Sequence, residues 1–377
     1  MKKYIIILII GVVILGFIIG GYILRNKNND EIPGGVNNNS TSTLGSPSGV
    51  SGKDFPIKVM DGAVFRYFIE NDGALIAILT DGKIIRSKNN QKEELSASPI
   101  DRLINTHFSF DGKKLATLSG NKNSPQLSIF DIESKTWLPI EEGAESASWS
   151  PTDLKLAYLT RKSAGLSLKI IDLNSKKPTP KETFLIPAYD LHLNWTQQSR
   201  IVIGERPTRL IPTSAWFFDT KTGLLSPAIR DEFGLEILWS QTGYLGLASV
   251  SGEGGNKLKI FDLSGKTINN LGFFTFADKC AFSSALASAT SSVKNDFIIC
   301  AVPENINYLT TNLVPDDYEK GAFFTKDNIY KVALDGTIVK TIFSADKVKI
   351  DVSNLRVVDN KLFFVNRLDQ QLYSISL

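Results

Sequence analysis

Histidine and cysteine are scarce in this 377-residue chain, which contains two of each. His107, His192, Cys280 and Cys300 are too few and too widely spaced to form a Cys/His metal site that a sequence pattern could identify. The sequence also lacks a DxDxDG calcium loop and a GxSxG nucleophile elbow. We therefore predict no cofactor and no metal, and we name no catalytic residue.

The chain also lacks a strong charge of either sign. Its 42 basic and 39 acidic residues give a formal net charge of +3, and no five basic residues are adjacent. Because binding to nucleic acid depends first on clustered lysine and arginine, we predict no nucleic-acid partner. With 42% hydrophobic residues, the chain can nevertheless bury at least one large core.

A long apolar segment runs from Ile5 to Leu24 and contains no charged residue. About twenty helical residues span a bilayer core, so we predict a transmembrane anchor within residues 1–24. The two lysines ahead of the segment favour a cytoplasmic amino terminus and a single-pass plasma-membrane protein. A cleaved signal peptide is the alternative, although the segment is longer than an ordinary signal-peptide core. Gly16 and Gly20 form a GxxxG pair that would allow a weak helix-mediated dimer.

Residues 25–54 are rich in asparagine, glycine, serine and threonine, and they contain no aromatic residue. Such a segment cannot bury enough apolar surface to offset the entropy lost on ordering. We predict that it is a disordered linker between the anchor and a folded domain that comprises residues 55–377.

The segment "ASWSPTDLKLAYLT", residues 147–160, recurs along the folded domain. Related segments place Phe108, Trp149, Trp195 and Trp239 at intervals of 41, 46 and 44 residues, and an aspartate follows each by 23 or 24 residues. Short alternating apolar runs separated by turn pairs such as DG and SG predict four strands in each unit. A period of 40 to 50 residues built from four strands is typical of a β-propeller, an all-β fold. Weaker copies extend the series at Phe68, Phe282 and Leu355.

These seven positions predict seven blades, and a six-bladed ring with an irregular first unit is the alternative. Only three strands follow in the last unit, so we expect residues 55–60 to supply its missing outer strand and close the ring. The sixth unit is extended, since Leu355 comes 73 residues after Phe282, and we assign an insertion to residues 303–327. Ser150 falls in the turn between two strands, where we predict a structural role and no nucleophile.

The repeats "SWSPTDLKLAYL" and "IIDLNSK" are similar to those of TolB-like, WD40-like (PD40-type) propellers. True WD40 units carry Gly-His early and Trp-Asp late, and this chain has neither pair. The combination of anchor, linker and propeller also resembles membrane-anchored propellers found in bacterial genomes. This resemblance implies a propeller in the cell envelope and carries no established activity with it.

In a propeller, the loops after the second and fourth strands of each blade share one face, which we call the long-loop face. We expect this face to point away from the membrane. Loops on a rigid scaffold often hold binding residues. The candidate partner- or ligand-binding residues are Arg206, Arg209, Tyr308, Asp316, Asp317 and Tyr318. Two alternatives stay open. Arg206 and Arg209 would simply lie in an exposed loop, or the insertion would simply cover its blade and the channel mouth.

Cys280 and Cys300 are predicted to form a disulfide. Aligning their strands with those of the second unit makes them directly opposed neighbours, with Cβ atoms about 4.5 to 5.5 Å apart. An oxidising exterior would favour the bond. His107 and His192 fall on inner strands, where we predict interior or channel-wall positions and no catalysis.

The function predicted from these features is a non-catalytic, membrane-tethered module that binds a protein or peptide of the cell envelope. A glycan- or small-ligand-binding propeller is the alternative, and a propeller hydrolase or lyase ranks third. An aromatic channel mouth with few charges would favour a glycan, and a broad mixed rim would favour a protein. A deep pocket with converging carboxylates would favour an enzyme.

Overall fold

The computed structural model describes residues 55–89, 91–252, 255–283 and 297–377, all within one compact unit, Ser51–Leu377. The predicted anchor at residues 1–24 and the predicted linker at residues 25–54 lie outside the described residues. Within those four ranges, no helix is long and apolar enough to cross a membrane.

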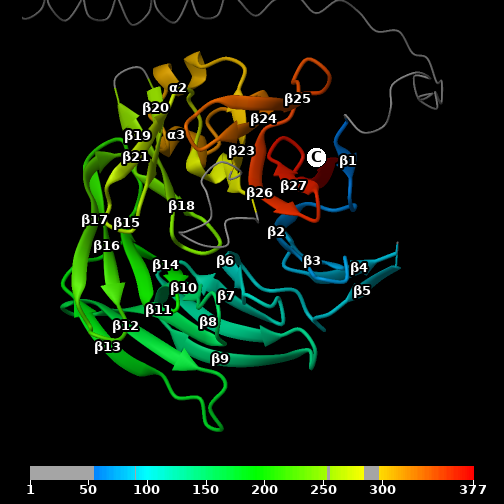
Figure 1. Cartoon of the computed structure of the whole chain (residues 1–377). Helices are drawn as coiled ribbons and strands as arrows, with labels where there is room; N and C mark the ends of the chain where they lie inside the picture. The colour runs from blue at the N-terminus through cyan, green and yellow to red at the C-terminus, as the bar shows by residue number, and fades with distance from the viewer. Residues whose placement is uncertain (1–54, 90, 253–254, 284–296) are drawn as a thin grey trace, which may run out of the picture. The chain divides into compact units, whose positions relative to one another are not determined.

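Seven four-stranded antiparallel sheets surround a common axis, and each sheet is one blade (Figure 1). The predicted seven-bladed propeller is confirmed, and the six-bladed alternative is wrong. In chain order, blade one contains β2 (Val64–Ile69), β3 (Leu75–Leu79), β4 (Ile84–Lys88) and β5 (Gln91–Glu94). Blade two contains β6 (Leu103–Phe108), β7 (Lys114–Asn121), β8 (Ser124–Asp131) and β9 (Thr136–Glu142). Blade three contains β10 (Ala144–Trp149), β11 (Lys155–Lys162), β12 (Gly165–Asp172) and β13 (Lys181–Ile186).

The remaining blades follow the same order, with the inner strand first. Blade four contains β14 (Leu191–Gln197), β15 (Arg200–Glu205), β16 (Pro212–Asp219) and β17 (Leu225–Phe233). Blade five contains β18 (Glu236–Trp239), β19 (Gly246–Gly252), β20 (Gly255–Phe261) and β21 (Thr267–Leu271). Blade six contains β22 (Cys280–Phe282), β23 (Phe297–Pro303), β24 (Asp327–Ala333) and β25 (Ile338–Phe343). Blade seven contains β26 (Val352–Val358), β27 (Lys361–Asn366), β28 (Gln371–Ser376) and, as its outer strand, β1 (Ile57–Lys58).

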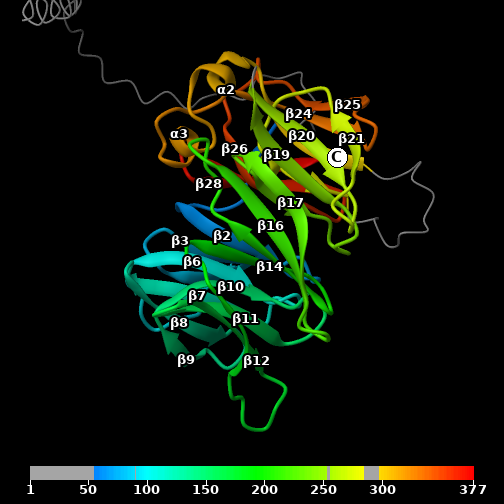
Figure 2. The same cartoon turned by 90° about the vertical axis from the view of Figure 1, so that its left-hand side faces the viewer.

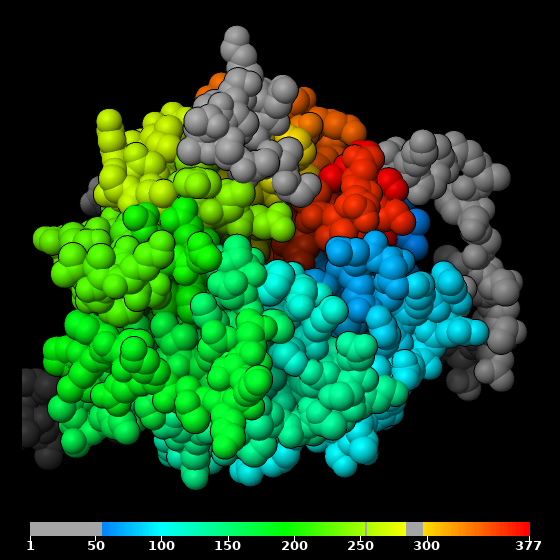
Figure 3. All heavy atoms as spheres, turned by 60° about the horizontal axis from the view of Figure 1, so that its bottom comes forward, coloured from blue at the N-terminus to red at the C-terminus, as the bar shows by residue number. Residues whose placement is uncertain are grey.

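The two ends of the described chain close the ring, as predicted. β1 pairs antiparallel with β28, where Ile57 opposes Ser374, and the blue first blade packs beside the red last blade in Figure 3. One detail of blade seven was wrong, because Val357 and not Leu355 opposes the first apolar residue of the next strand, Leu362. The turn between β26 and β27 causes the difference, because the opposed residues Val357 and Leu362 are five residues apart, whereas Trp149 and Leu156 in blade three are seven apart.

Apolar side chains fill the joints between neighbouring blades. In the joint between blades two and three, Trp149 packs with Leu127 and Tyr158 and is 6% exposed. Its indole Nε1 donates a hydrogen bond to the carbonyl oxygen of His107, 2.8 Å away. The adjacent Ser150 is fully buried, and its Oγ accepts hydrogen bonds from the backbone N–H groups of the following turn. Ser150 is therefore a turn residue, as predicted.

Blade six departs from the regular pattern. The chain between β23 and β24 forms two short helices, α2 (Asn307–Thr311) and α3 (Asp316–Glu319), which lie together in Figure 2. A short 3-10 helix, η1 (Ala277–Lys279), precedes β22. The helices share a small core of their own, in which Leu309 and Tyr318 contact Phe276. Cys280 opposes Cys300 across β22 and β23 and is bonded to it, so the predicted disulfide is confirmed.

Candidate functional site

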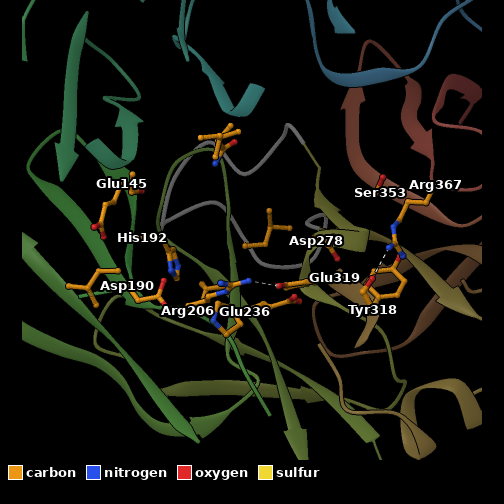
Figure 4. A pocket seen from close by; sticks show the side chains of 18 residues that line it. Glu145, Asp190, His192, Arg206, Glu236, Asp278, Tyr318, Glu319, Ser353 and Arg367 are labelled. Carbon is orange, nitrogen blue, oxygen red and sulfur yellow. Dashed lines mark hydrogen bonds and ion pairs between the residues drawn. The ribbon is translucent and has the colours of Figure 1, made fainter. Parts of the chain in front are cut away.

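A cavity of about 860 Å³ lies on the axis at the long-loop face, and we call it the axial cavity (Figure 4). Its wall is formed by the first residues of the inner strands β6, β10, β14, β18 and β26. The loop after β15, the helix η1 and the insertion helix α3 complete the rim. Residues from six of the seven blades, which are far apart in the sequence, therefore line the same cavity.

Acidic residues dominate one side of the axial cavity. In blades three to six, the start of the inner strand or the segment just before it contributes one acidic residue, in the order Glu145, Asp190, Glu236 and Asp278, and the insertion adds Glu319. Each of the first four stands three to five residues ahead of the aromatic residue that repeats in its blade. Because every inner strand enters the ring from the long-loop face, residues at this distance from the aromatic all reach the channel mouth. The sequence analysis missed Glu145, Asp190, Glu236 and Asp278, and their similar positions, three to five residues ahead of the repeating aromatic, are the signal that would have identified them.

Glu236 is the most strongly perturbed of these carboxyl groups. Burial raises its pKa well above the ordinary value, and the charges of Asp278 and Glu319 raise it further. The hydroxyl of Ser249 donates a hydrogen bond to Glu236 Oε2 at 3.0 Å, which offsets the rise in part. Asp278 and Glu319 also face the cavity, where they are partly shielded from bulk water, and this shielding raises the pKa of each carboxyl group. These three groups therefore bind protons more readily than free carboxylates do.

Two arginines balance part of this negative charge. Arg206, one of the predicted binding residues, lines the axial cavity, and its Nη2 lies 3.8 Å from Glu319 Oε2 (Figure 4). Arg367 is held more rigidly, because its Nη2 donates to the carbonyl oxygen of Tyr318 at 2.7 Å. Its guanidinium also stacks on the Tyr318 ring, with Cζ 3.6 Å from the ring centroid. Of the two, Arg206 is the more available to a partner, since its side chain is 66% exposed.

Tyr318, a second predicted residue, borders the axial cavity and is otherwise buried. Its ring stacks on Phe276 with centroids 4.4 Å apart, and its hydroxyl donates to Asp351 Oδ1 at 2.6 Å. Burial and the charge of Asp351 raise the pKa of Tyr318 well above its ordinary value. Because the hydroxyl is already occupied by Asp351, Tyr318 positions α3 at the cavity and is not free to bind a ligand through its oxygen.

A buried charged network lies directly behind this wall. Lys279 Nζ donates to Thr325 Oγ1 at 2.6 Å, Asp327 Oδ2 at 2.6 Å and Asp351 Oδ1 at 2.7 Å. Lys279 and both aspartates are fully buried. Burial alone would raise the pKa of Asp351, but Lys279 and the hydrogen bonds hold it below its ordinary value. Burial raises the pKa of Asp327, and Lys279 offsets that rise only in part. The network joins blade six, blade seven and the insertion.

The predicted residue Asp316 links the insertion to blade four. Its carboxylate accepts hydrogen bonds from Thr208 Oγ1 at 2.8 Å and from the backbone N–H of Arg209 at 2.7 Å. A second cavity, of about 390 Å³, lies beside this contact. Asp190, Arg206 and Pro207 line both cavities, so the two adjoin across the loop after β15.

The other predicted residues lie away from the axial cavity. Arg209 donates through Nη1 to the carbonyl oxygen of Ser251 at 3.1 Å, and the Asp317 carboxylate accepts from the backbone N–H of Leu313 at 2.8 Å. Both are therefore engaged in internal contacts. Tyr308 is 40% exposed and lies parallel to Phe323, with ring centroids 6.0 Å apart. Of the six predicted residues, the structure brings Arg206 and Tyr318 together at the axial cavity.

The two histidines occupy different positions along the channel. His192 lines the axial cavity and lies over Gly204, where an added Cβ would approach the ring at 2.5 Å. The loss of bulk water around His192 inside the cavity lowers its pKa. His107 lies one strand position before Phe108 on β6, and burial lowers its pKa to about 3. Among the residues that the structure describes, no three His, Cys, Asp or Glu side chains are placed to hold a metal ion.

Solved propellers are similar to this chain in fold. A TolB from Acinetobacter baumannii has 15% sequence identity and a TM-score of 0.44, and the match covers 72% of this chain and 61% of that one. The β-propeller domain of the Trilobed protease from Pyrococcus furiosus has 17% identity and a TM-score of 0.46, with coverage of 70% and 77%. The tricorn protease has 10% identity and a TM-score of 0.51, with coverage of 84% of this chain and 33% of that one.

Identities this low bear on the fold alone. The seven sheets confirm the propeller predicted from the TolB-like repeats, and the tricorn protease match agrees with them. No protein-family model matches the chain, and a search of curated proteins finds no similar sequence.

Proposed function

We propose that this chain is a membrane-tethered, extracytoplasmic propeller that binds a protein or peptide of the cell envelope on its long-loop face, without catalysing a reaction. The observation that carries the proposal is the pair of adjoining cavities on that face, of about 860 and 390 Å³. Together they form a binding surface that extends from the channel axis across the loop after β15.

Exposed apolar side chains on the same loops favour a protein partner. Leu210 and Ile211, in the loop after β15, are 68% and 61% exposed. The insertion adds Leu313 and Phe324, which are also exposed. Interfaces between proteins combine apolar anchors with a polar, charged rim, and large apolar side chains gathered on one face are typical of them. A mixed rim of this kind favours a protein or peptide over a glycan.

The direction of β1 supports the proposed orientation. β1 is the outer strand of its blade, so it runs toward the long-loop face and begins on the opposite face. A chain that reaches β1 from an anchor at Ile5–Leu24 would therefore approach the face opposite the cavities. In this arrangement the long-loop face points away from the bilayer and is accessible to partners.

A capture experiment with the full chain in mild detergent tests the proposal. Replacing both Leu210 and Ile211 with serine should remove the captured partner. The matched control replaces Ile338 and Val339 with serine. These residues are 51% and 58% exposed on the outer strand β25, and this variant should retain the partner. Equal capture by the two double variants, or loss from both, would contradict binding at the long-loop face.

A second candidate function rests on the converging carboxyl groups. Glu236 and Asp278 face one cavity, and both have raised pKa values, as a general acid in a sugar hydrolase or lyase requires. Incubating the full chain with envelope polysaccharides separates the two functions. The interaction module predicts no cleavage, whereas cleavage that disappears in Glu236→Gln and persists in the exposed-site control Glu133→Gln would establish the enzyme.

A further inference from the structure

The side of the channel opposite the carboxylates is basic. Arg356 on β26, Arg66 on β2 and His107 on β6 come from the inner strands of three consecutive blades and are each partly buried. Direct contacts hold these strands together. The Tyr67 hydroxyl donates to the carbonyl oxygen of Asn354 at 2.6 Å, and the rings of Phe68 and Phe108 are 5.4 Å apart. These contacts hold the three inner strands side by side, so that Arg356, Arg66 and His107 lie on adjacent strands around the channel.

Neither Arg66 nor Arg356 forms an ion pair with a carboxylate in the described part of the chain, and the buried Nε of Arg66 has no acceptor there. The Arg356 guanidinium lies over the Tyr67 ring, with Cζ 5.8 Å from the ring centroid. By contrast, the buried Lys279 is matched by two aspartates. An unpaired charge that is partly removed from water is costly, so an anion bound to these arginines would stabilise the fold.

The cationic groups are also close enough to act on one another. Burial lowers the pKa of Arg66 to about 10, and the charge of Arg356 contributes to the shift. Burial and then both arginines lower the pKa of His107 to about 3. His107 is therefore neutral and can still donate or accept a hydrogen bond. An anion placed between these groups would relieve the repulsion that they exert.

We propose that Arg66 and Arg356 bind a small oxyanion, a carboxylate or phosphate group, on the channel wall formed by β26, β2 and β6. Guanidinium groups match the two oxygens of such anions with parallel hydrogen bonds. The site lies deeper than the axial cavity, because Asn105 and Ser353 line that cavity and His107 and Arg356 follow them by two and three residues on the same strands. It is a separate site from the surface proposed for partner binding.

Unfolding of the full chain in detergent, measured with increasing inorganic phosphate or acetate against sodium chloride of equal ionic strength, tests this site. Both oxyanions should raise the unfolding midpoint of the wild type to a plateau. Arg66→Gln and Arg356→Gln should each need about tenfold more anion or show no plateau, since a hydrogen bond to a charged group contributes at least a factor of ten. The exposed Arg230→Gln, on β17, is the matched control and should respond as the wild type does.

Two further measurements make the result decisive. In sodium chloride, Arg66→Gln and Arg356→Gln should be at least as stable as the wild type, because each removes an uncompensated charge. A plateau with N-acetyl-triglycine and none with its amide would assign the site to a peptide carboxylate, and a plateau with phosphate alone would assign it to a free oxyanion. An identical response of wild type and both arginine variants to every anion would overturn the proposal.

Discussion

Two joints between blades show different ways of holding this ring together. Between blades two and three, Leu127, Trp149 and Tyr158 form an apolar core with one indole hydrogen bond. Blades six and seven also share an apolar core, in which Ile299 contacts blade-seven residues such as Phe364. Their joint additionally contains the fully buried Lys279 network. Apolar contacts are therefore sufficient for a joint, and the charged network needs another explanation.

The explanation lies in the insertion. The network forms in the blade that carries α2 and α3, and through Asp351 it holds Tyr318 at the rim of the axial cavity. A buried ion pair adds little net stability over well-packed apolar residues, but removing one partner is strongly destabilising. The network therefore fixes where the insertion sits, and the apolar joints supply the stability of the ring.

The largest effect is expected from Trp149→Ala in the apolar joint. The cavity left by the indole should cost about 3 to 5 kcal/mol. Loss of the hydrogen bond to the carbonyl oxygen of His107 should add about 1 kcal/mol. Urea unfolding measures the sum. The control is Trp137→Ala on the outer strand β9, where the residue is 41% exposed, and this variant should lose much less. Equal losses would mean that the joint between blades two and three is not held by its core.

Lys279→Met should be the next most severe change. It leaves Asp327 and Asp351 buried and facing each other without a cation, which costs about 3 to 5 kcal/mol. Adding Asp327→Asn removes one of the two charges and should restore part of the free energy of unfolding. If Lys279→Met were as stable as the wild type, the charged network would add nothing to the joint between blades six and seven. Limited proteolysis should cut the insertion first in Lys279→Met and not in Trp149→Ala.

The disulfide provides a third contrast between the same regions. Cys280 and Cys300 occupy the opposed positions that Ala147 and Tyr158 fill in blade three. The bonded residues are 20 apart in the sequence, and the chain-entropy model gives about 3 kcal/mol for a loop of that order. Replacing both cysteines with alanine should lower the free energy of unfolding by about that amount and lower the unfolding midpoint with it, and adding a reductant should then have no further effect. A midpoint unchanged by the replacement would contradict a stabilising role for the bridge.

The smallest expected change is in the pH dependence of stability, through Glu236→Gln. The native fold raises the pKa of Glu236, so the folded protein binds this proton more tightly than the unfolded chain does. The resulting stabilisation is complete below the pKa of the unfolded chain, about 4.3, and is lost as the pH rises through the pKa of the native state. Relative to the variant, the wild type should therefore become less stable as the pH rises from about 4 through neutral, by less than in the changes above. Parallel curves for wild type and Glu236→Gln would refute the shift, and Glu133→Gln serves as the surface control.

The fold was largely predictable because its signal repeats. The spacing of Trp149, Trp195 and Trp239 identified the blades, and the strand count identified the closure through residues 55–60. Leu355 was misassigned because it stands seven residues before Leu362, the spacing of Trp149 and Leu156 in blade three, whereas the shorter turn of blade seven brings Val357 opposite Leu362.

The candidate site was predicted less completely. Arg206 and Tyr318 were found because they lie in conspicuously long loops, whereas Glu236 and Asp278 stand on or beside short inner strands. Within one blade, an acidic residue ahead of a strand is an ordinary turn residue. It becomes part of a cavity only when ring closure brings equivalent positions from several blades around one axis. That information belongs to the assembled ring and not to any single repeat.

The strand that closes the ring also determines how the molecule would respond to mechanical load. β1 contains two residues, Ile57 and Lys58, whereas its neighbour β28 is bonded along its whole length to β27. A pull between the amino-terminal segment and a partner on the long-loop face would reach the propeller first at β1. Blade seven would therefore yield before any other blade. Single-molecule pulling on the full chain should show a first, low-force extension that disappears when β1 is crosslinked to β28.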